Sequence, residues 1–363
     1  MSENKRILDE NIANLDKNLE VKTSLDVDDV VFYDVKKAPF KLYGACKDEL
    51  DVFKRMPENI AENVSEGVKN LNFNTAGIRV RFSTDSDYVA IKAVMPSLRR
   101  MSHMALTGSS GFDMYLCENG SYRFIKTFVP PQDAENGYES IVYFADKKTR
   151  CLEINFPLYS RVDELYIGVR SGSEVSECDG YKYDKPVLYY GSSITQGGCA
   201  SKPGNSYQSI ISHELDCDYI NLGFSGSAKG EREIAEYIAD IDCSVFVCDY
   251  DYNAPTLEHL KKTHLELYKV FRAKNHDTSV IFVSAPTVDS ANKDKVDRKQ
   301  VILDTYNYAL SNGDKNVSFV DGMEMFSGKY GNVYTVDGAH PTDAGFLRMA
   351  EYIGSHVKKM LKA

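Results

Sequence analysis

The segment Gly191-Ser192-Ser193-Ile194-Thr195 contains residue types that can bond covalently to a substrate. It follows the short apolar run Val187 to Tyr190, which predicts a buried strand. The carboxyl end of such a strand is where an α/β sheet presents a nucleophile, although a plain Gly/Ser turn explains this segment alone equally well. Thr195 replaces the second glycine of the Gly-x-Ser-x-Gly elbow, and no Gly-Lys-Ser/Thr follows to bind phosphate.

A serine hydroxyl needs a base, and a neutral imidazole is the usual one. His340 lies in Asp337-Gly338-Ala339-His340-Pro341, directly before the last predicted helix. Pro341 disfavours helical dihedrals at His340, and Asp337 can accept the Nδ1–H of the imidazole. The other histidines are His213, His259, His264 and His356 in predicted helices, His276 in a polar loop and His103 in the N-terminal half. We therefore expect Ser193, His340 and Asp337 to act as nucleophile, base and acid.

Acyl transfer also needs hydrogen-bond donors directed at the developing oxyanion. Gly226, in Asn221-Leu222-Gly223-Phe224-Ser225-Gly226, offers a backbone N–H at one predicted strand end, and the Ser193 N–H is a further donor. Asn253, in Asp249-Tyr250-Asp251-Tyr252-Asn253, offers a side-chain amide at the next strand end. The second segment has the Asp-x-Asp-x-Asn pattern of a calcium loop, but Ala254 and Leu260 replace its glycine and its bidentate glutamate. We expect no metal, and structural or solvated roles for its acidic residues.

These motifs together resemble the sequence blocks of the SGNH/GDSL hydrolases. The chain shows Gly-x-Ser-x-Thr, Asn-x-Gly-x-Ser-Gly, Asp-x-Asn-Ala and Asp-x-x-His in the family's order, over residues 186–363. The resemblance implies that Ser193 is the nucleophile, that Gly226 and Asn253 are oxyanion donors, and that Asp337 and His340 are the acid and base. Each motif alone is a weak signal, whereas four in register are strong.

Two departures from the family's pattern concern neighbours of the site residues. Ser192 stands where the family has the aspartate of Gly-Asp-Ser, and Ala254 follows Asn253 where the family has aspartate. The first change can alter the local hydrogen bonds and the backbone donor at Ser193. Such variants with an N-terminal β-sandwich are similar to bacterial two-domain SGNH hydrolases related to carbohydrate acetylesterases. The resemblance implies removal of O-acetyl groups from a saccharide, such as oligosaccharides of mannan or xylan, without a cofactor.

Strand and helix patterns alternate after residue 180, which predicts a doubly wound parallel sheet with helices on both faces. The expected strands are 187–190, 219–222, 245–248, 280–283 and 317–320, and the expected helices are 206–215, 231–241, a long one after residue 256 and the last one after residue 341. Ligands of such sheets bind at the carboxyl ends of the strands. Residues 181–363 are therefore predicted to form a three-layer α/β/α catalytic domain.

Short strand patterns dominate residues 1–180. Ile78, Val80 and Phe82 alternate with arginines as in a half-buried strand, and Asn119-Gly120 predicts a hairpin turn. Further strands are expected at 30–35, 89–95, 112–117, 122–129, 140–144, 152–156 and 165–169. This pattern predicts an N-terminal β-sandwich, a jelly roll. It is either a sugar-binding module or a wall of the active site, and Arg99, Arg100, His103 and residues 108–113 are its candidates for reaching Ser193.

Composition and charge exclude some classes of binding partner. The chain of 363 residues has a formal net charge of −10 and no Lys/Arg-rich run, which argues against nucleic acid and anionic membrane as partners. No signal peptide or transmembrane segment is visible in its pattern. The eight cysteines form no CxxC pair and are expected to be reduced thiols, which favours a cytoplasmic location.

Alternatives to a carbohydrate acetylesterase remain open. A short-chain acyl esterase, a lysophospholipase or a thioesterase would use the same residues on another ester. A non-catalytic carbohydrate-binding protein is the alternative from a different class, and the serine, histidine and aspartate speak against it. The substrate is expected to be a small-molecule or oligosaccharide ester, and a homo-oligomer is left open.

Overall fold

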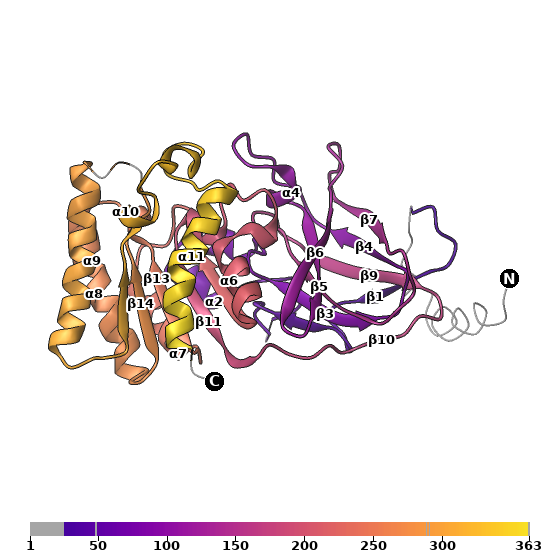
Figure 1. The fold of residues 1–363 in the computed structure, drawn as a ribbon, viewed down its shortest axis with the longest axis horizontal. Coiled ribbons are helices and arrows are strands. Elements are labelled where there is room, and N and C mark those ends of the chain that lie inside the picture. Colours follow the sequence, from indigo (N-terminus) through magenta and orange to yellow (C-terminus); the bar gives the residue numbers. More distant parts are fainter. Residues whose placement is uncertain (1–24, 48, 288, 290, 362–363) are drawn as a thin grey trace.

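Two differently built parts lie along the length of the molecule (Figure 1). The computed structural model describes residues 25–47, 49–287, 289 and 291–361. Antiparallel strands occupy one end, and a parallel sheet between helices occupies the other. The fold is thus the expected β-sandwich followed by an α/β domain.

Two antiparallel sheets face each other in the sandwich. One has the order β1-β9-β4-β7, and the other has the order β10-β3-β8-β5-β6 with β2 beside β3. The strands are β1 (Val30–Asp34), β2 (Lys41–Tyr43), β3 (Arg79–Thr84), β4 (Tyr88–Val94), β5 (Phe112–Glu118), β6 (Ser121–Phe128), β7 (Gly137–Tyr143), β8 (Arg150–Asn155), β9 (Glu164–Arg170) and β10 (Val175–Ser176). Asn119 and Gly120 both have positive φ, 53° and 73°, as a two-residue hairpin turn between β5 and β6 requires.

The expectation of a half-buried strand at β3 is wrong, because this strand is buried on both faces. Val80 and Phe82 face the sandwich core, as the alternation predicts. Arg79, on the other face, is fully buried against the C-terminal domain, where it pairs with Asp218 and lies 3.8 Å from the centroid of the Tyr219 ring. The polar face of the strand is therefore a domain interface rather than a solvated surface.

Five parallel strands in the order β12-β11-β13-β14-β15 form the C-terminal sheet. They are β11 (Tyr183–Gly191), β12 (Cys217–Gly223), β13 (Val245–Asp249), β14 (Ser279–Val283) and β15 (Val317–Val320). Helices α6 (Tyr207–Leu215) and α11 (Asp343–Met360) pack on one face, and α7 (Arg232–Asp240), α8 (Leu257–Lys274) and α9 (Lys293–Ser311) pack on the other. The single turns α5 (Ser193–Gln196) and α10 (Gly322–Met325) follow β11 and β15.

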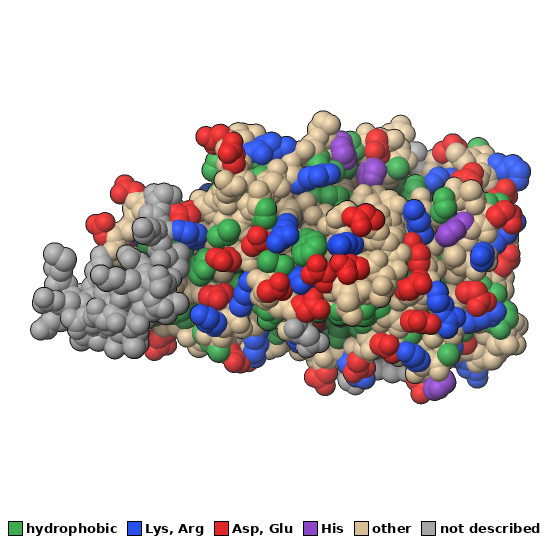
Figure 2. Space-filling view, turned by 180° about the vertical axis from the view of Figure 1, so that it is seen from behind, with side chains coloured by type: hydrophobic (Ala, Val, Ile, Leu, Met, Phe, Trp, Pro, Cys, Tyr) green, Lys and Arg blue, Asp and Glu red, His purple; other side chains and the backbone are tan. Residues whose placement is uncertain are grey.

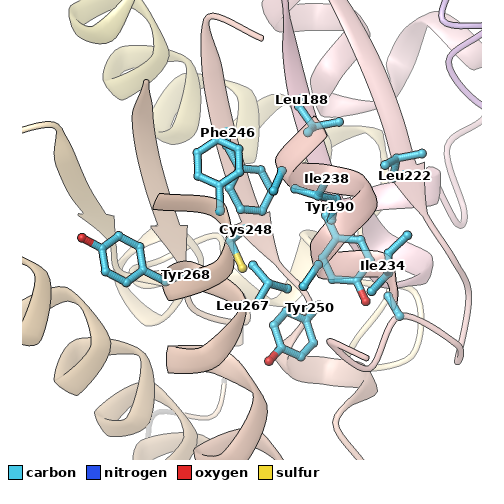
Figure 3. Close-up of a cluster of buried hydrophobic side chains, with 14 of the residues drawn as sticks. Leu188, Tyr190, Leu222, Ile234, Ile238, Phe246, Cys248, Tyr250, Leu267 and Tyr268 are labelled. Atoms are coloured by element: carbon cyan, nitrogen blue, oxygen red, sulfur yellow. The ribbon is translucent and has the colours of Figure 1, made fainter. Parts of the chain in front are cut away.

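The core beneath α7 and α8 also receives residues from the N-terminal half. Leu188, Phe246 and Leu267 are among the side chains that fill it between sheet and helices (Figure 3). Helices α2 (Glu58–Val64) and α3 (Glu66–Asn72) precede the sandwich strand β3, and their Ala61 and Val68 join this same cluster. The one-turn helix α4 (Leu106–Ser109) lies between β4 and β5. The two halves of the chain are thus packed together by shared core residues.

Several helices and strands of the structure were not predicted from the sequence. The 19-residue helix α9 has Arg298 and Thr305 on its buried face, so it lacks a clear apolar stripe. Strands β2 and β10 have only three and two residues, which is too short for a period-2 pattern. Helices α2 and α3 share one short segment and bury few residues each.

The expectation that all cysteines are reduced is wrong for one pair. Cys151 on β8 and Cys178 after β10 form a disulfide, with Cα atoms 5.6 Å apart. Both segments pair with β3 at Ser83, which lies opposite Cys151 on one side and opposite Ser176, two residues before Cys178, on the other, so sheet register brings together cysteines that are 27 residues apart in sequence. The other six are free and buried. Spacing alone could not reveal this pair, since it depends on sheet order.

The domain interface holds a fully buried carboxylate, Glu153 on β8. It accepts hydrogen bonds from Tyr181 Oη (2.6 Å) and pairs with His213 Nε2 of α6 (2.8 Å). Burial alone would raise its pKa, but His213 and the guanidinium groups of Arg79 and Arg81 lower the pKa to about 2. The ionised carboxylate therefore stabilises the folded, docked state.

This charge predicts a stability that depends on pH. The folded pKa of Glu153 lies below its ordinary value of 4.5, so its contribution is present above pH 4.5 and is lost as pH falls toward 2. Glu153→Gln should reduce the free energy of unfolding at neutral pH by about 3 kcal/mol and flatten its fall across this window. Urea unfolding at several pH values measures both, with the exposed Glu258→Gln as control. An unchanged pH slope in Glu153→Gln would contradict the assignment.

The surface mixes both signs of charge. Acidic and basic side chains are interspersed over the face seen in Figure 2, with small apolar areas between them. No helix in the described part of the chain is long and apolar enough to cross a bilayer.

Candidate active site

Ser193 lies at the tight junction between strand β11 and helix α5. The strand ends at Gly191, where an added Cβ would lie 2.0 Å from Thr195 Oγ1 and 2.2 Å from the carbonyl oxygen of Asp249, so only glycine fits. Ser192 is the N-cap of α5, and its Oγ accepts the Ile194 N–H at 3.2 Å. Ser192 thus supplies by its hydroxyl the helix cap that aspartate can also provide. Ser193 is the first residue of the helix and is half-buried.

His340 is held by a hairpin-like loop before α11. The Val336 N–H donates to the His340 carbonyl at 2.9 Å, and Thr335 pairs with Pro341 in an isolated bridge. Asp337 Oδ1 accepts the backbone N–H of His340 at 2.8 Å, and its Oδ2 lies 2.7 Å from His340 Nδ1. The same carboxylate therefore fixes both the loop and the ring orientation.

Ser193, His340 and Asp337 form a continuous hydrogen-bonded chain. Ser193 Oγ lies 2.9 Å from His340 Nε2, although the two residues are 147 positions apart. Burial opposes ionisation of Asp337, but hydrogen bonds from the His340 side chain and from the His340 and Ala339 backbones lower its pKa to about 2. At neutral pH the carboxylate is ionised and accepts the Nδ1–H, which leaves Nε2 as the acceptor for the Ser193 proton.

The two predicted oxyanion donors lie at the ends of β12 and β13. Gly226 has φ +68°, and its N–H has no partner among the described residues. Asn253 Nδ2 donates one hydrogen to the Phe224 carbonyl at 2.8 Å, and an amide nitrogen carries a second one. The Ser193 N–H stands in the first turn of α5, where no intrahelical acceptor exists. The site therefore holds three donors that an oxyanion can use.

One cavity of about 310 Å³ collects these groups. Ser193, Gly226, Asn253 and His340 all line it, which brings together residues from four separate segments. The remaining lining residues are Ile194, Ser225, Tyr252 and Ala339. Among the described residues no cluster of three or more His, Cys, Asp or Glu side chains is arranged to hold a metal ion.

Asp249, at the end of β13, and Asp251, just after it, have structural rather than solvated side chains. Asp249 is buried, and its Oδ2 accepts hydrogen bonds from Thr195 Oγ1 and Tyr207 Oη, each at 3.2 Å. Asp251 is buried and accepts the Ala285 N–H at 2.9 Å, and burial raises its pKa to about 6. These carboxyl groups brace the nucleophile turn and the Asn253 segment from behind.

Two residues of the N-terminal domain lie next to Ser193 or His340. His103 is exposed, and its ring centroid lies 6.0 Å from that of His340. Tyr159, which the sequence did not single out, is buried and donates from its hydroxyl to the Ser193 carbonyl at 3.2 Å. Arg100 instead binds the carbonyls of Gln132 and Ala134, and the Arg99 backbone bonds to nearby serines of its own domain. The N-terminal domain therefore contacts the site residues from outside the cavity, whose lining residues all belong to the C-terminal domain.

Residues 108–113, which the sequence suggested as candidates for reaching Ser193, instead contact residues 200–204, a few positions after helix α5. Gly108 lies so close to the Ala200 carbonyl oxygen that an added Cβ would be 2.0 Å from it. Asp113 is buried, and its Oδ2 accepts the Gly204 N–H at 2.9 Å and pairs with Lys202 Nζ at 3.3 Å. Gly108 and Asp113 thus help to position residues 200–204, and they do not contact Ser193.

The two parts of the chain match two different family models, and the gap between the two matches spans the connection between strands β10 and β11. Residues 184–358 match the model of the GDSL-like lipase/acylhydrolase family, and residues 30–175 match the model GxDLY, described as the N-terminus of SGNH hydrolase-type esterases. The chain belongs to the SGNH/GDSL hydrolases. It is accordingly a carboxylic ester hydrolase. Gly111-Phe112-Asp113-Met114-Tyr115 fits the Gly-x-Asp-Leu-Tyr pattern in the name of the second model except that Met114 replaces the leucine, and Asp113 of this segment binds Gly204 and Lys202 of the C-terminal domain.

Solved structures of similar fold include hydrolases and a transferase. A protein of Bacteroides ovatus ATCC 8483, described as a GDSL-like lipase, is 25% identical with a TM-score of 0.83, over 92% of this chain and 100% of that one. A salicylyl-acyltransferase from a tetracycline biosynthetic pathway is 16% identical (TM-score 0.74, 93% and 100% covered). An acetyl xylan esterase from the rumen bacterium Butyrivibrio proteoclasticus is 12% identical (0.56, 92% and 98%). No curated protein matches this SGNH hydrolase.

The Asn253 amide predicts a specific kinetic loss. Asn253→Ala should lower kcat by about 10²–10³-fold with little change in KM, because the hydrogen bond to the oxyanion forms fully only in the transition state. Steady-state hydrolysis of p-nitrophenyl acetate measures both constants. Asn275→Ala, which removes an amide at the far end of α8, serves as control. A rise in KM at unchanged kcat would place Asn253 in substrate binding instead.

Proposed function

We propose that this enzyme removes O-acetyl groups from saccharides through an acyl-enzyme on Ser193. The observation that carries the proposal is the Ser193–His340–Asp337 chain at a small cavity with unengaged oxyanion donors. The structural likeness to carbohydrate esterases, including the acetyl xylan esterase, supports the choice of ester. Mannan- and xylan-type oligosaccharides are the substrates that we place first.

The size of the cavity supports a short acyl group. At about 310 Å³ it lies at the low end of ligand pockets, and Ile194, Tyr252 and Ala339 form its apolar contacts. The Tyr252 hydroxyl is anchored to the Pro286 carbonyl at 2.7 Å, so this side chain is not free to swing out. An acetyl group fits such a space, whereas a long acyl chain needs a deeper apolar groove.

The mechanism follows from the hydrogen-bonded chain. His340 Nε2 takes the Ser193 hydroxyl proton as Oγ bonds to the ester carbonyl carbon, and the resulting oxyanion accepts hydrogen bonds from Ser193 N, Gly226 N and Asn253 Nδ2. Collapse breaks the bond to the sugar oxygen, which takes the proton from His340. Water, deprotonated by His340, then attacks the acetyl-enzyme, and collapse breaks the bond between the acetyl carbon and Ser193 Oγ, which takes the proton back from His340 as acetate leaves. Asp337 stays ionised and stabilises the imidazolium throughout.

Other acyl substrates would use the same residues. A short-chain acyl esterase, a lysophospholipase or a thioesterase differs in the leaving group and in the length of the acyl chain. A non-catalytic carbohydrate-binding role has no support from the site, because such a role does not need a serine hydroxyl within 2.9 Å of an imidazole.

Two assays test the proposal. Hydrolysis of p-nitrophenyl acetate should exceed hydrolysis of the octanoate ester by at least an order of magnitude in kcat/KM, since a few extra buried methylenes decide fit. Acetylated xylan and mannan oligosaccharides should lose acetyl mass when incubated with the enzyme. Preference for octanoate, or acetylated oligosaccharides left intact while acetyl thioesters are cleaved, would contradict it.

We also propose that the enzyme works in the cytoplasm on imported oligosaccharides. The six free buried cysteines are typical of that compartment, whereas the Cys151–Cys178 disulfide is favoured by an oxidising one. Cell fractionation with an antibody decides between them. Recovery of the enzyme outside the cytoplasm would contradict this part of the proposal and would admit larger polymers as substrates.

A further inference from the structure

Arg55 is a buried cation at the back of the oxyanion site, and it comes from the N-terminal half of the chain. Its side chain is 2% exposed. Its Nη1 donates to the carbonyl oxygens of Asn221 (3.2 Å) and Gly223 (2.5 Å), at the end of β12, and its Nη2 donates to the Leu71 carbonyl at 2.6 Å. The guanidinium also lies 4.4 Å from the centroid of the Phe224 ring. All these contacts are to neutral groups.

A second buried arginine shows what is missing at Arg55. Arg79, on β3, contacts the same strand β12, where it donates to the Tyr219 carbonyl at 3.2 Å and stacks on the Tyr219 ring. Arg79 forms an ion pair with Asp218, whereas no carboxylate of the described residues forms one with Arg55. Burial accordingly lowers the pKa of Arg55, to about 9, so the group is still charged at neutral pH. A buried charge without a partner of opposite sign is costly, which calls for a reason.

The segment that Arg55 holds carries the oxyanion donors. Phe224, against which the guanidinium stacks, accepts the Asn253 Nδ2 hydrogen bond at its carbonyl (2.8 Å). Gly226 follows two residues later, and Gln196 Oε1 accepts the intervening Ser225 N–H at 3.0 Å. Gly223, Phe224 and Ser225 are thus fixed by Arg55, Asn253 and Gln196 before substrate binds. Both predicted donors, Gly226 N and Asn253 Nδ2, depend on this segment.

We propose that Arg55 is a positioning residue that fixes the Gly223–Gly226 segment and whose charge stabilises the oxyanion. The inference rests on the proposed acyl-enzyme mechanism on Ser193. The reaction creates one negative charge, on the carbonyl oxygen that faces Gly226 and Asn253. This transient anion is the counter-charge that Arg55 lacks in the resting enzyme. Fixed positive charge in a buried environment favours the transition state without reorganisation.

Variants of Arg55 separate its charge from its structural contacts. Arg55→Met, of similar length and uncharged, should lower kcat about tenfold or more and leave KM within about threefold. This loss corresponds to about 1.4 kcal/mol of transition-state stabilisation. Arg55→Lys keeps the charge and should stay within about threefold of the wild-type kcat. Arg79→Met is the matched control: it should reduce thermal stability while kcat stays within about twofold. Rates are expressed per active serine, titrated with a phosphorylating reagent.

Inhibition by methylboronic acid provides a readout that a purely structural role would not move. This acid forms an anionic tetrahedral adduct with a catalytic serine. Its inhibition constant should therefore rise in Arg55→Met by the same factor by which kcat falls. In Arg55→Lys the inhibition constant should stay close to that of the wild type. Equal weakening in the two variants, or kcat and inhibition constant within twofold of wild type in Arg55→Met, would overturn the proposal. If Arg55→Met does not fold, Arg55→Lys decides: a tenfold weaker inhibition overturns it. A wild-type enzyme that the acid does not inhibit would count against the role of Ser193 instead.

Discussion

Ser193→Ala is expected to lower kcat by about 10⁴-fold or more while the protein stays folded. The hydroxyl is the atom that forms the acyl-enzyme, and Ser193 lies at the surface of the cavity, where a methyl group leaves no buried void. Its Oγ contacts His340 Nε2 and is not part of the cap of helix α5. The measurement is hydrolysis of p-nitrophenyl acetate, with the circular dichroism melt as the test of folding.

Ser192→Ala is the matched control for this variant. The Ser192 hydroxyl caps α5 by accepting the Ile194 N–H, so its loss should reduce stability by about 1 kcal/mol and kcat by less than tenfold. The two serines are neighbours in sequence but differ in what their hydroxyls contact. If Ser192→Ala were the inactive variant and Ser193→Ala retained activity, the nucleophile would be misassigned.

His340→Gln is expected to lower kcat by a similar factor, about 10⁴-fold, because the side-chain amide cannot take the serine proton. Glutamine retains hydrogen-bonding groups in the loop, and the Asp337 Oδ1 contacts to the backbone of Ala339 and His340 do not depend on the ring. The fold should therefore persist. The same acetate ester and melt measure both effects, and His276→Gln, in the loop after α8, is the control.

The double variant Ser193→Ala with His340→Gln tests whether the two residues act as one unit. Its kcat should be no lower than that of the worse single variant, within about threefold, since either loss already removes the acyl-enzyme route. Additive losses would mean that the serine and the histidine contribute independently. That outcome would contradict a shared proton transfer between them.

The architecture was predictable because both parts follow regular patterns. Strict 3–4 spacing marked α11, the Asn119-Gly120 pair marked the β5–β6 hairpin, and short apolar runs marked the parallel strands. The chemistry-bearing residues were recognisable because their motifs sit next to strand ends, and parallel strands end at one edge of a sheet. The structure places Ser193, Gly226, Asn253 and His340 at one cavity, and their catalytic roles stay predictions.

What the sequence did not reveal depends on contacts between distant segments. Arg55 and Tyr159 carry no local motif, and each becomes part of the site only because the sandwich packs against the ends of β11 and β12. The arginine alternation in β3 predicts a half-buried strand, since a sequence pattern does not say whether a polar face meets water or another domain. Helix α9 buries Arg298, whose guanidinium donates to the carbonyls of Asp251 and Ala254, on either side of Asn253. Because this buried position is charged, the sequence of α9 shows no continuous apolar face.

The covalent labelling of the nucleophile tests the central claim most directly. Incubation with diethyl p-nitrophenyl phosphate should release one p-nitrophenol per chain, in step with the loss of esterase activity. Peptide mass mapping should then find the diethylphosphoryl group on Ser193, and Ser193→Ala should release none. Complete loss of activity with Ser193 unmodified, or full activity with Ser193 fully labelled, would contradict the assignment of Ser193 as the nucleophile of this SGNH hydrolase.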